Sequence, residues 1–93
     1  MTFTQIKEVL ARYDARLDKF GIVANQDRVH CQKCLEHVRW MCRELPPMMD
    51  AIWEAEMIDL TEVEKVHRWL GFIQGVLFSE GVFTIDEMRE HNR

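Results

Sequence analysis

Apolar residues near the start of the chain recur at intervals of three and four, the spacing that places side chains on one face of an α-helix. The series comprises Phe3, Ile6, Leu10, Tyr13, Leu17 and Phe20. Thr2 followed by Gln5 fits a capping box, and Gly21 suits the left-handed position at which many helices end. We therefore predict a first helix of about 17 residues between these signals.

A second series with the same spacing lies further along the chain. Its members are Cys31, Leu35, Val38, Cys42 and Leu45. Pro46 and Pro47 follow directly, and neither proline can donate the backbone hydrogen bond that a continuing helix requires. The pattern predicts a second helix from about Asp27 to Leu45 that ends at the two prolines.

Beyond the prolines, the pattern predicts a short helix and then a third long one. Apolar residues from Met48 to Met57 suit the short helix, with Pro47 at its first position. Thr61 followed by Glu64 is another capping-box pattern, and Ser79-Glu80-Gly81 interrupts the helix that it begins. The apolar face of this third long helix consists of Val63, Val66, Leu70, Ile73 and Leu77.

The end of the chain completes an all-helical pattern. Thr84 with Glu87 repeats the capping box, which predicts a last short helix from Ile85 to about His91. No useful length alternates with a period of two, so strands are not expected. We predict one all-α domain over residues 1–93, a small antiparallel helical bundle of three long helices plus two short ones.

The third long helix has more apolar surface than one contact face requires. Trp69, Phe72 and Val76 form a second apolar set beside the main face. One interpretation is a central helix that touches both neighbours. The other is that a dimer or a partner protein covers this set, which makes these three residues candidate partner-binding residues.

Gly71 and Gly75 lie four residues apart in the same helix, where each is expected to cost about 1 kcal/mol relative to alanine. They lie away from both apolar sets, and in a soluble helix such a pair is weak evidence for dimerisation. Close packing of a loop or of the C-terminal helix on that side is one alternative. Local relief for the bulky neighbours Phe72 and Phe78 is another.

Charge is unevenly divided along the chain. Residues 1–45 have eight Lys or Arg and six Asp or Glu, and residues 46–93 have four and ten, so +2 and −6 make up the net charge of −4. Six acids and no base lie from Asp50 to Glu64, including Glu54. Such a segment repels phosphate, which disfavours nucleic acid as a partner. It is either a solvated acidic face or a surface for a basic protein, mimicry of nucleic acid included.

One group of residues invites comparison with metal sites and thiol redox motifs. The group comprises His30, Cys31, Cys34, His37 and Cys42. Structural zinc sites normally join ligands from two elements, whereas all of these residues lie on one predicted helix. We interpret them as ordinary core and boundary residues and predict no metal or cofactor, with metal binding kept as an alternative.

Patterns typical of enzymes and of export are missing. There is no glycine-rich phosphate loop, no GxSxG, no HExxH and a single serine, Ser79, so we expect no enzymatic activity. The amino terminus MTFTQIKE lacks the basic and apolar regions of a signal peptide, and no apolar run approaches the roughly 20 residues needed to span a bilayer. These features predict a cytoplasmic protein with reduced cysteines.

The blocks RWLGFIQGVL and GVFTIDEMREHNR, with HVRWMC earlier, resemble a group of small uncharacterised helical proteins encoded by bacteriophages and prophages. The resemblance covers residues 36–42 and 65–93. It implies the cytoplasm of a host bacterium and action by binding a host or phage protein, and it supplies no catalytic residues. The amino-terminal helix and the His-Cys group lie outside it.

Together these patterns predict a non-enzymatic accessory protein that acts by protein–protein binding and self-associates as a homodimer. The candidate contact residues are Trp69, Phe72, Val76, Gly71, Gly75, Asp50 and Glu54. A metal-binding or nucleic-acid-associated regulatory protein remains the alternative, although a helix-turn-helix here would have a recognition helix, IDEMREHN, with three acids and one arginine.

Overall fold

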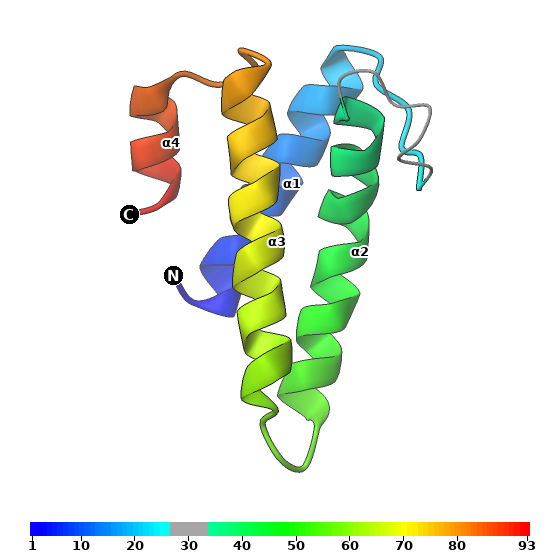
Figure 1. Cartoon of the computed structure of the whole chain (residues 1–93), viewed down its shortest axis with the longest axis vertical. Helices are drawn as coiled ribbons and strands as arrows, with labels where there is room; N and C mark the ends of the chain where they lie inside the picture. Colours follow the sequence, from blue (N-terminus) through cyan, green and yellow to red (C-terminus); the bar gives the residue numbers. More distant parts are fainter. Residues whose placement is uncertain (27–33) are drawn as a thin grey trace.

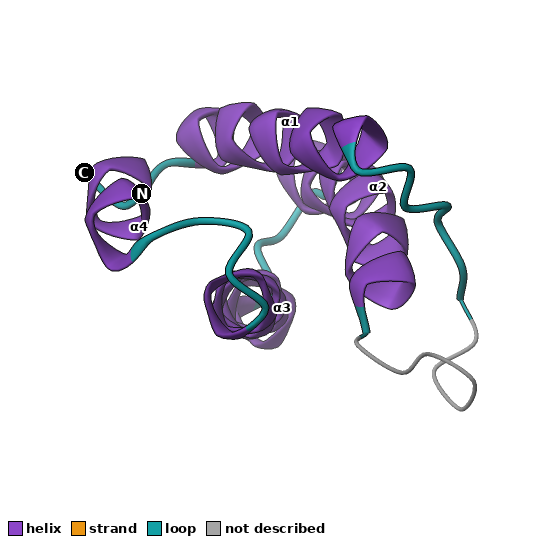
Figure 2. Cartoon of the chain, turned by 90° about the horizontal axis from the view of Figure 1, so that it is seen from above, coloured by secondary structure: helices purple, strands orange, loops and turns teal. Residues whose placement is uncertain are grey.

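The computed structural model describes residues 1–26 and 34–93, and every regular element within those ranges is a helix. α1 (Phe3–Lys19), α2 (Leu35–Glu54) and α3 (Leu60–Ser79) are long, and α4 (Ile85–His91) is short. α2 and α3 run side by side in opposite directions, and α4 lies beside the end of α3 (Figure 1). α1 crosses the pair at an angle, which the view from above shows most clearly (Figure 2).

The all-α class is thus confirmed, but the predicted count of three long and two short helices is wrong, because the described residues contain one short helix. An antiparallel bundle is not confirmed either, since α1 lies obliquely to the other two long helices (Figure 2).

Local capping signals set both ends of α1. The Thr2 hydroxyl accepts a hydrogen bond from the Gln5 backbone N–H at 3.2 Å, and the Gln5 side chain accepts one from the Thr2 N–H at 2.8 Å. Gly21 has φ of 72°, and the Ile22 N–H donates to the carbonyl of Leu17, as in a Schellman motif. These predictions are confirmed. Phe20, predicted on the apolar face, is instead the C-cap residue and 58% exposed.

The predicted helix end at Pro46-Pro47 is wrong, because α2 continues through both prolines to Glu54. The segment that we assigned to a separate short helix is therefore largely the second half of α2. Each proline inside a helix costs about 3 kcal/mol. Leu45 and Met49, on either side of the prolines, are completely buried against the core. Tertiary packing of these neighbours offsets the local cost.

The start of α2 also differs from the prediction. Its first residue is Leu35, because Cys34 has a left-handed backbone with φ of 60°, a conformation that cannot continue a right-handed helix. The predicted start at Asp27 lies outside the described residues.

α3 begins two residues earlier than predicted. Asp59 is the N-cap, and its carboxylate accepts a hydrogen bond from the Thr61 N–H at 2.9 Å, so the Thr61–Glu64 capping box is wrong. The helix ends before Gly81, which has φ of 72°, as predicted. The capping box of Thr84 at the start of α4 is also confirmed.

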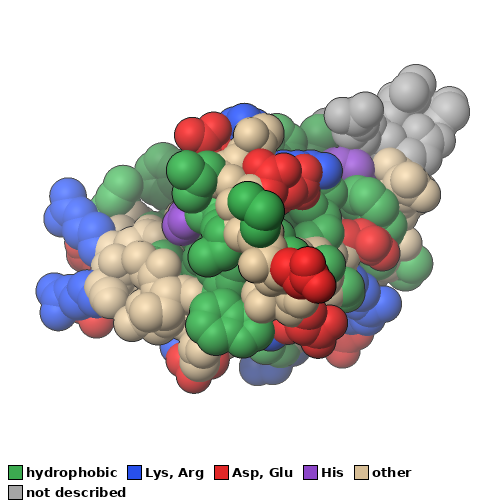
Figure 3. Space-filling view, turned by 90° about the horizontal axis from the view of Figure 1, so that it is seen from below, with side chains coloured by type: hydrophobic (Ala, Val, Ile, Leu, Met, Phe, Trp, Pro, Cys, Tyr) green, Lys and Arg blue, Asp and Glu red, His purple; other side chains and the backbone are tan. Residues whose placement is uncertain are grey.

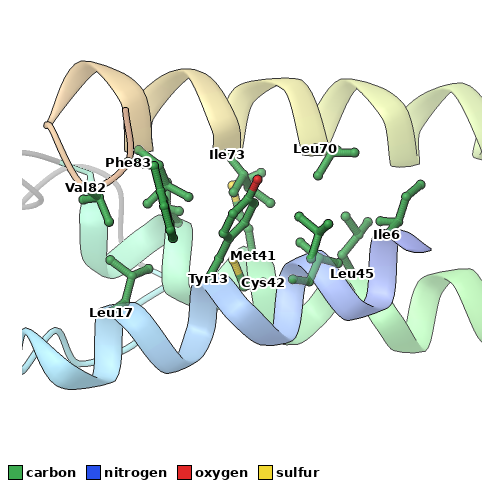
Figure 4. Close-up of a cluster of buried hydrophobic side chains, with 14 of the residues drawn as sticks. Ile6, Tyr13, Leu17, Met41, Cys42, Leu45, Leu70, Ile73, Val82 and Phe83 are labelled. Carbon is green, nitrogen blue, oxygen red and sulfur yellow. The ribbon is translucent and has the colours of Figure 1, made fainter. Parts of the chain in front are cut away.

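The core lies between the three long helices and is closed at one end by residues that follow α3 (Figure 4). Most of the predicted apolar faces are buried there. The completely buried side chains include Ile6, Tyr13 and Leu17 of α1, Val38 and Leu45 of α2, and Val66, Ile73 and Leu77 of α3. This core holds α2 and α3 together along their length and leaves the turn that joins them at the far end of the molecule (Figure 1).

Candidate protein-binding surfaces

The end of the molecule near α4 is closed by a hydrogen-bonded aromatic cluster. The Tyr13 hydroxyl lies 2.9 Å from His91 Nδ1, and the side-chain amide of Gln74 donates to the same hydroxyl at 3.0 Å. Burial raises the pKa of Tyr13 to about 12 and lowers the pKa of His91. The Tyr13 hydroxyl therefore stays protonated at neutral pH. These hydrogen bonds hold α4 against α1 and α3, so the cluster has a structural role.

A second polar cluster joins α1 to α2. The Arg39 guanidinium donates to the carboxylates of Asp14 and Asp18 and to the carbonyl of Ile22. Burial would raise the pKa of Asp14, but hydrogen bonds from Arg39 and Arg43 outweigh it and lower that pKa. Because the charge of Arg39 is compensated within the fold, this cluster also has a structural role.

The predicted aromatic set on α3 is only partly available to a partner. Trp69 and Val76 are half-buried and pack against the core, with the Trp69 ring 6.0 Å from that of Trp40. Phe72 is 49% exposed and, together with Met41 and other residues, lines a shallow hollow of about 220 Å³. The structure thus supports the central-helix interpretation for Trp69 and Val76 and leaves Phe72 as the exposed member of the set.

Gly71 and Gly75 face open space. A methyl group added at either position would meet no atom within 4 Å. Neither a described loop nor α4 packs on this side, so the explanation of these glycines by close packing within the chain is wrong for the described residues. Both positions are exposed on α3, the helix that also presents Phe72.

The acidic segment lies at the opposite end of the molecule from the aromatic cluster, around the turn between α2 and α3. Lys7 forms an ion pair with Asp50, and Asp59 caps α3. Within the described residues, Glu54, Glu56 and Glu64 take part in no ion pair, and all three are exposed. Much of the negative charge of this segment is therefore uncompensated.

Large apolar side chains at the same turn are the feature that sequence reasoning missed. Trp53 is 82% exposed and Met57 is 83% exposed, and Ile58 and Leu60 beside them are also exposed. Seen from below, hydrophobic side chains gather near the middle of this end, with carboxylates beside them (Figure 3). The sequence pattern predicts Trp53 and Met57 only as apolar residues of a short helix after the prolines. The sequence signal for this exposed surface is the run Met57-Ile58-Asp59-Leu60, whose apolar residues do not follow helical spacing.

A groove of about 650 Å³ lies between this turn and the start of α1. Its lining includes Phe3, Ile52, Trp53, Ile58, Val63 and His67. A second hollow of about 460 Å³, toward Lys7 and Asp50, also has Phe3 and Trp53 among its lining residues. Trp53 therefore stands between two depressions, an arrangement that suits an inserted side chain of a partner.

The His-Cys group does not form a metal site within the described residues, where no three ligand-type side chains are placed to hold an ion. His30 and Cys31 lie outside those residues. His37 is buried, with Nδ1 3.1 Å from the carbonyl oxygen of Gln26, and it stacks on Trp40. Burial raises the pKa of the Cys42 thiol to about 12, so this cysteine is an unreactive core residue.

No protein-family model, curated protein or solved structure matches the chain. Among the described residues, no helix is both long enough and apolar enough to cross a lipid bilayer.

Proposed function

We propose that the protein is a non-enzymatic binding module that acts through protein–protein contacts. The observation that carries this proposal is the exposed apolar surface at the α2–α3 turn, where Trp53 and Met57 are more than four-fifths exposed. Such a gathering of large apolar side chains beside a groove is typical of interaction sites. The resemblance to phage and prophage proteins adds a setting, in which the partner is a host or phage protein in the bacterial cytoplasm.

The proposal includes self-association through α3. Phe72 is half-exposed, and the neighbouring side of the helix at Gly71 and Gly75 is open, so a second copy could approach the backbone there. The two surfaces belong to different parts of the molecule. One protomer could thus form a dimer through α3 and still present the α2–α3 turn to a partner.

Light scattering across a concentration series tests the homodimer. We expect a dimer that Phe72→Glu dissociates, because a buried carboxylate in the contact would be unpaired. Ile85→Glu is the matched control, since Ile85 is 51% exposed, as Phe72 nearly is, but lies on α4. A monomer at high concentration, or equal effects of both substitutions, would refute self-association through the Phe72 side.

A further inference from the structure

We propose that the groove beside the α2–α3 turn binds a basic amphipathic helix of a partner protein. This inference rests on the proposed protein-binding function and names the site and the chemistry of its ligand. The groove belongs to one end of the fold, formed by the start of α1, the last turns of α2 and the first turns of α3.

Trp53 is a large apolar residue of the groove. Its side chain is largely exposed, so it contributes little to the core, yet it lines both hollows at this end of the molecule. Ile58 and Val63 lie on the same groove. An aromatic side chain that stands beside a depression is the kind of residue that becomes a binding hot spot when a partner excludes water from it.

The rim of the groove carries carboxylate charge. Glu56 lines the groove directly, and Glu54 lies next to Trp53 in the sequence. Neither carboxylate has an ion-pair partner in the described part of the chain. From Asp50 to Glu64 the chain contains no Lys, Arg or His, and Lys7 is already paired with Asp50. The rim therefore favours a ligand with Lys or Arg beside its apolar stripe.

The same charges argue against a second copy of this chain as the occupant. In a two-fold symmetric contact each surface meets itself, so the acidic rim would face an identical acidic rim. Like charges opposed across an interface are destabilising. A foreign basic surface does not incur that cost, and its attraction to the rim would also increase the rate of association.

The shape of the site favours a helix. The described residues offer no sheet edge to which an extended peptide could add as a strand. A groove between helices instead accepts apolar anchors at positions i, i+3 or i+4 and i+7 of an amphipathic helix. Met1 and Met57 near the groove add flexible apolar side chains that can adapt to such anchors.

A model peptide tests the proposal directly. The probe is a fluorescently labelled peptide of leucine and lysine in amphipathic helical order, about 18 residues long so that a helix can form. Fluorescence anisotropy should show saturable binding to the full chain that weakens with added salt. Two further peptides serve as controls, one with the same residues in scrambled order and one with every lysine replaced by glutamate.

Protein variants then locate the binding site. We expect Trp53→Ala to weaken binding about 10-fold or more, as hot-spot truncations do. The double change Glu54→Gln and Glu56→Gln should weaken it about 3- to 10-fold and reduce its dependence on salt. Circular dichroism should confirm that these variants remain folded, which we expect because the altered side chains are exposed.

Phe78→Ala and Glu90→Gln are the matched controls, one apolar and one acidic, and both residues are exposed away from the groove. Neither should change the dissociation constant by more than about twofold, in keeping with substitutions outside a contact. Equal effects of Phe78→Ala and Trp53→Ala would overturn the assignment of the site.

The remaining outcomes separate this inference from the proposed function. Equal binding of the scrambled peptide would show that charge alone attracts the peptide, and it would overturn the proposal. Equal binding of the glutamate peptide would also overturn it, as would the absence of any binding. If the peptide fails while Phe72→Glu dissociates a dimer, protein binding stands and the groove assignment falls. If the peptide binds as expected to a protein that is monomeric, the groove assignment stands and only self-association falls.

Discussion

Large aromatic side chains are buried at one end of the molecule and exposed at the other. At the end near α4, Tyr13, Phe83 and His91 are buried against one another, and the guanidinium of Arg16 lies 4.5 Å from the centre of the Phe83 ring. At the end with the α2–α3 turn, Trp53 is exposed.

The difference comes from the presence of a covering element. α4 and the segment before it supply the partners that bury Tyr13, and within the described residues no buried side-chain nitrogen or oxygen lacks a hydrogen bond. Nothing in the described chain covers the α2–α3 turn in the same way. One end therefore stabilises the fold, and the other leaves large apolar side chains exposed.

The largest expected effect is at the closed end. Phe83→Ala should lower the free energy of unfolding by about 3–5 kcal/mol, because it removes a buried ring and leaves a cavity. Trp53→Ala, at the open end, should change it by no more than about 0.5 kcal/mol. Urea denaturation followed by circular dichroism measures both. Similar losses for the two aromatic substitutions would contradict the distinction between the ends.

A smaller effect is expected when only a hydroxyl is removed. Tyr13→Phe keeps the buried ring but leaves His91 Nδ1 and the Gln74 amide without their shared partner, which should cost about 1–3 kcal/mol. The same denaturation experiment applies. In a Tyr13→Phe, His91→Phe double variant the two losses should not add, because both changes remove the same hydrogen bond. Full additivity would show that the pair is not coupled.

The next prediction tests whether the open surface extends along α3. In dilute protein, where the chain is monomeric, Gly71→Ala should raise the free energy of unfolding by about 0.4–1 kcal/mol, since the added methyl group meets open space and restricts the unfolded chain. Gly21→Ala is the contrasting control and should be destabilising, because Gly21 has a left-handed backbone. Destabilisation by Gly71→Ala would mean that some part of the protein packs there.

The smallest effect that we expect is a dependence on pH from the closed end. Burial, with Arg12 nearby, lowers the pKa of His91 below its ordinary value of 6.5. The unfolded chain then binds a proton before the folded protein does. Stability should therefore be full above pH 6.5 and decline as the pH falls below it, until the folded imidazole also becomes protonated. Thermal unfolding from pH 7.5 to 5 measures this decline in stability. The decline should be smaller in His91→Gln. An unchanged decline in that variant would show that other titratable groups cause it.

Much of the fold follows from local sequence signals. Thr2 with Gln5 and Thr84 with Glu87 mark the starts of α1 and α4, because the hydrogen bonds of a capping box form within four consecutive residues. The left-handed glycines end α1 and α3 for an equally local reason. Buried residues at intervals of three and four follow from the helical repeat.

Features of the fold that depend on tertiary packing were predicted less well from the sequence. Pro46 and Pro47 stop an isolated helix, but in this fold the buried residues around them keep α2 continuous. Of the candidate binding residues, Phe72, Glu54 and Asp50 are exposed as a contact surface requires, whereas Trp69 is half-buried. Trp53 was missed because an apolar residue at a helical spacing has the same pattern whether or not another helix covers it.

The all-helical class, the ends of α1 and α4, most of the core faces and the acidic segment without bases can thus be read from the sequence, because they depend on spacing and on neighbouring residues. Which apolar faces are covered depends instead on tertiary packing. That outcome depends on where α1 crosses α2 and α3 and on where α4 packs, since burial is a property of residues that are distant in the chain and meet only after folding.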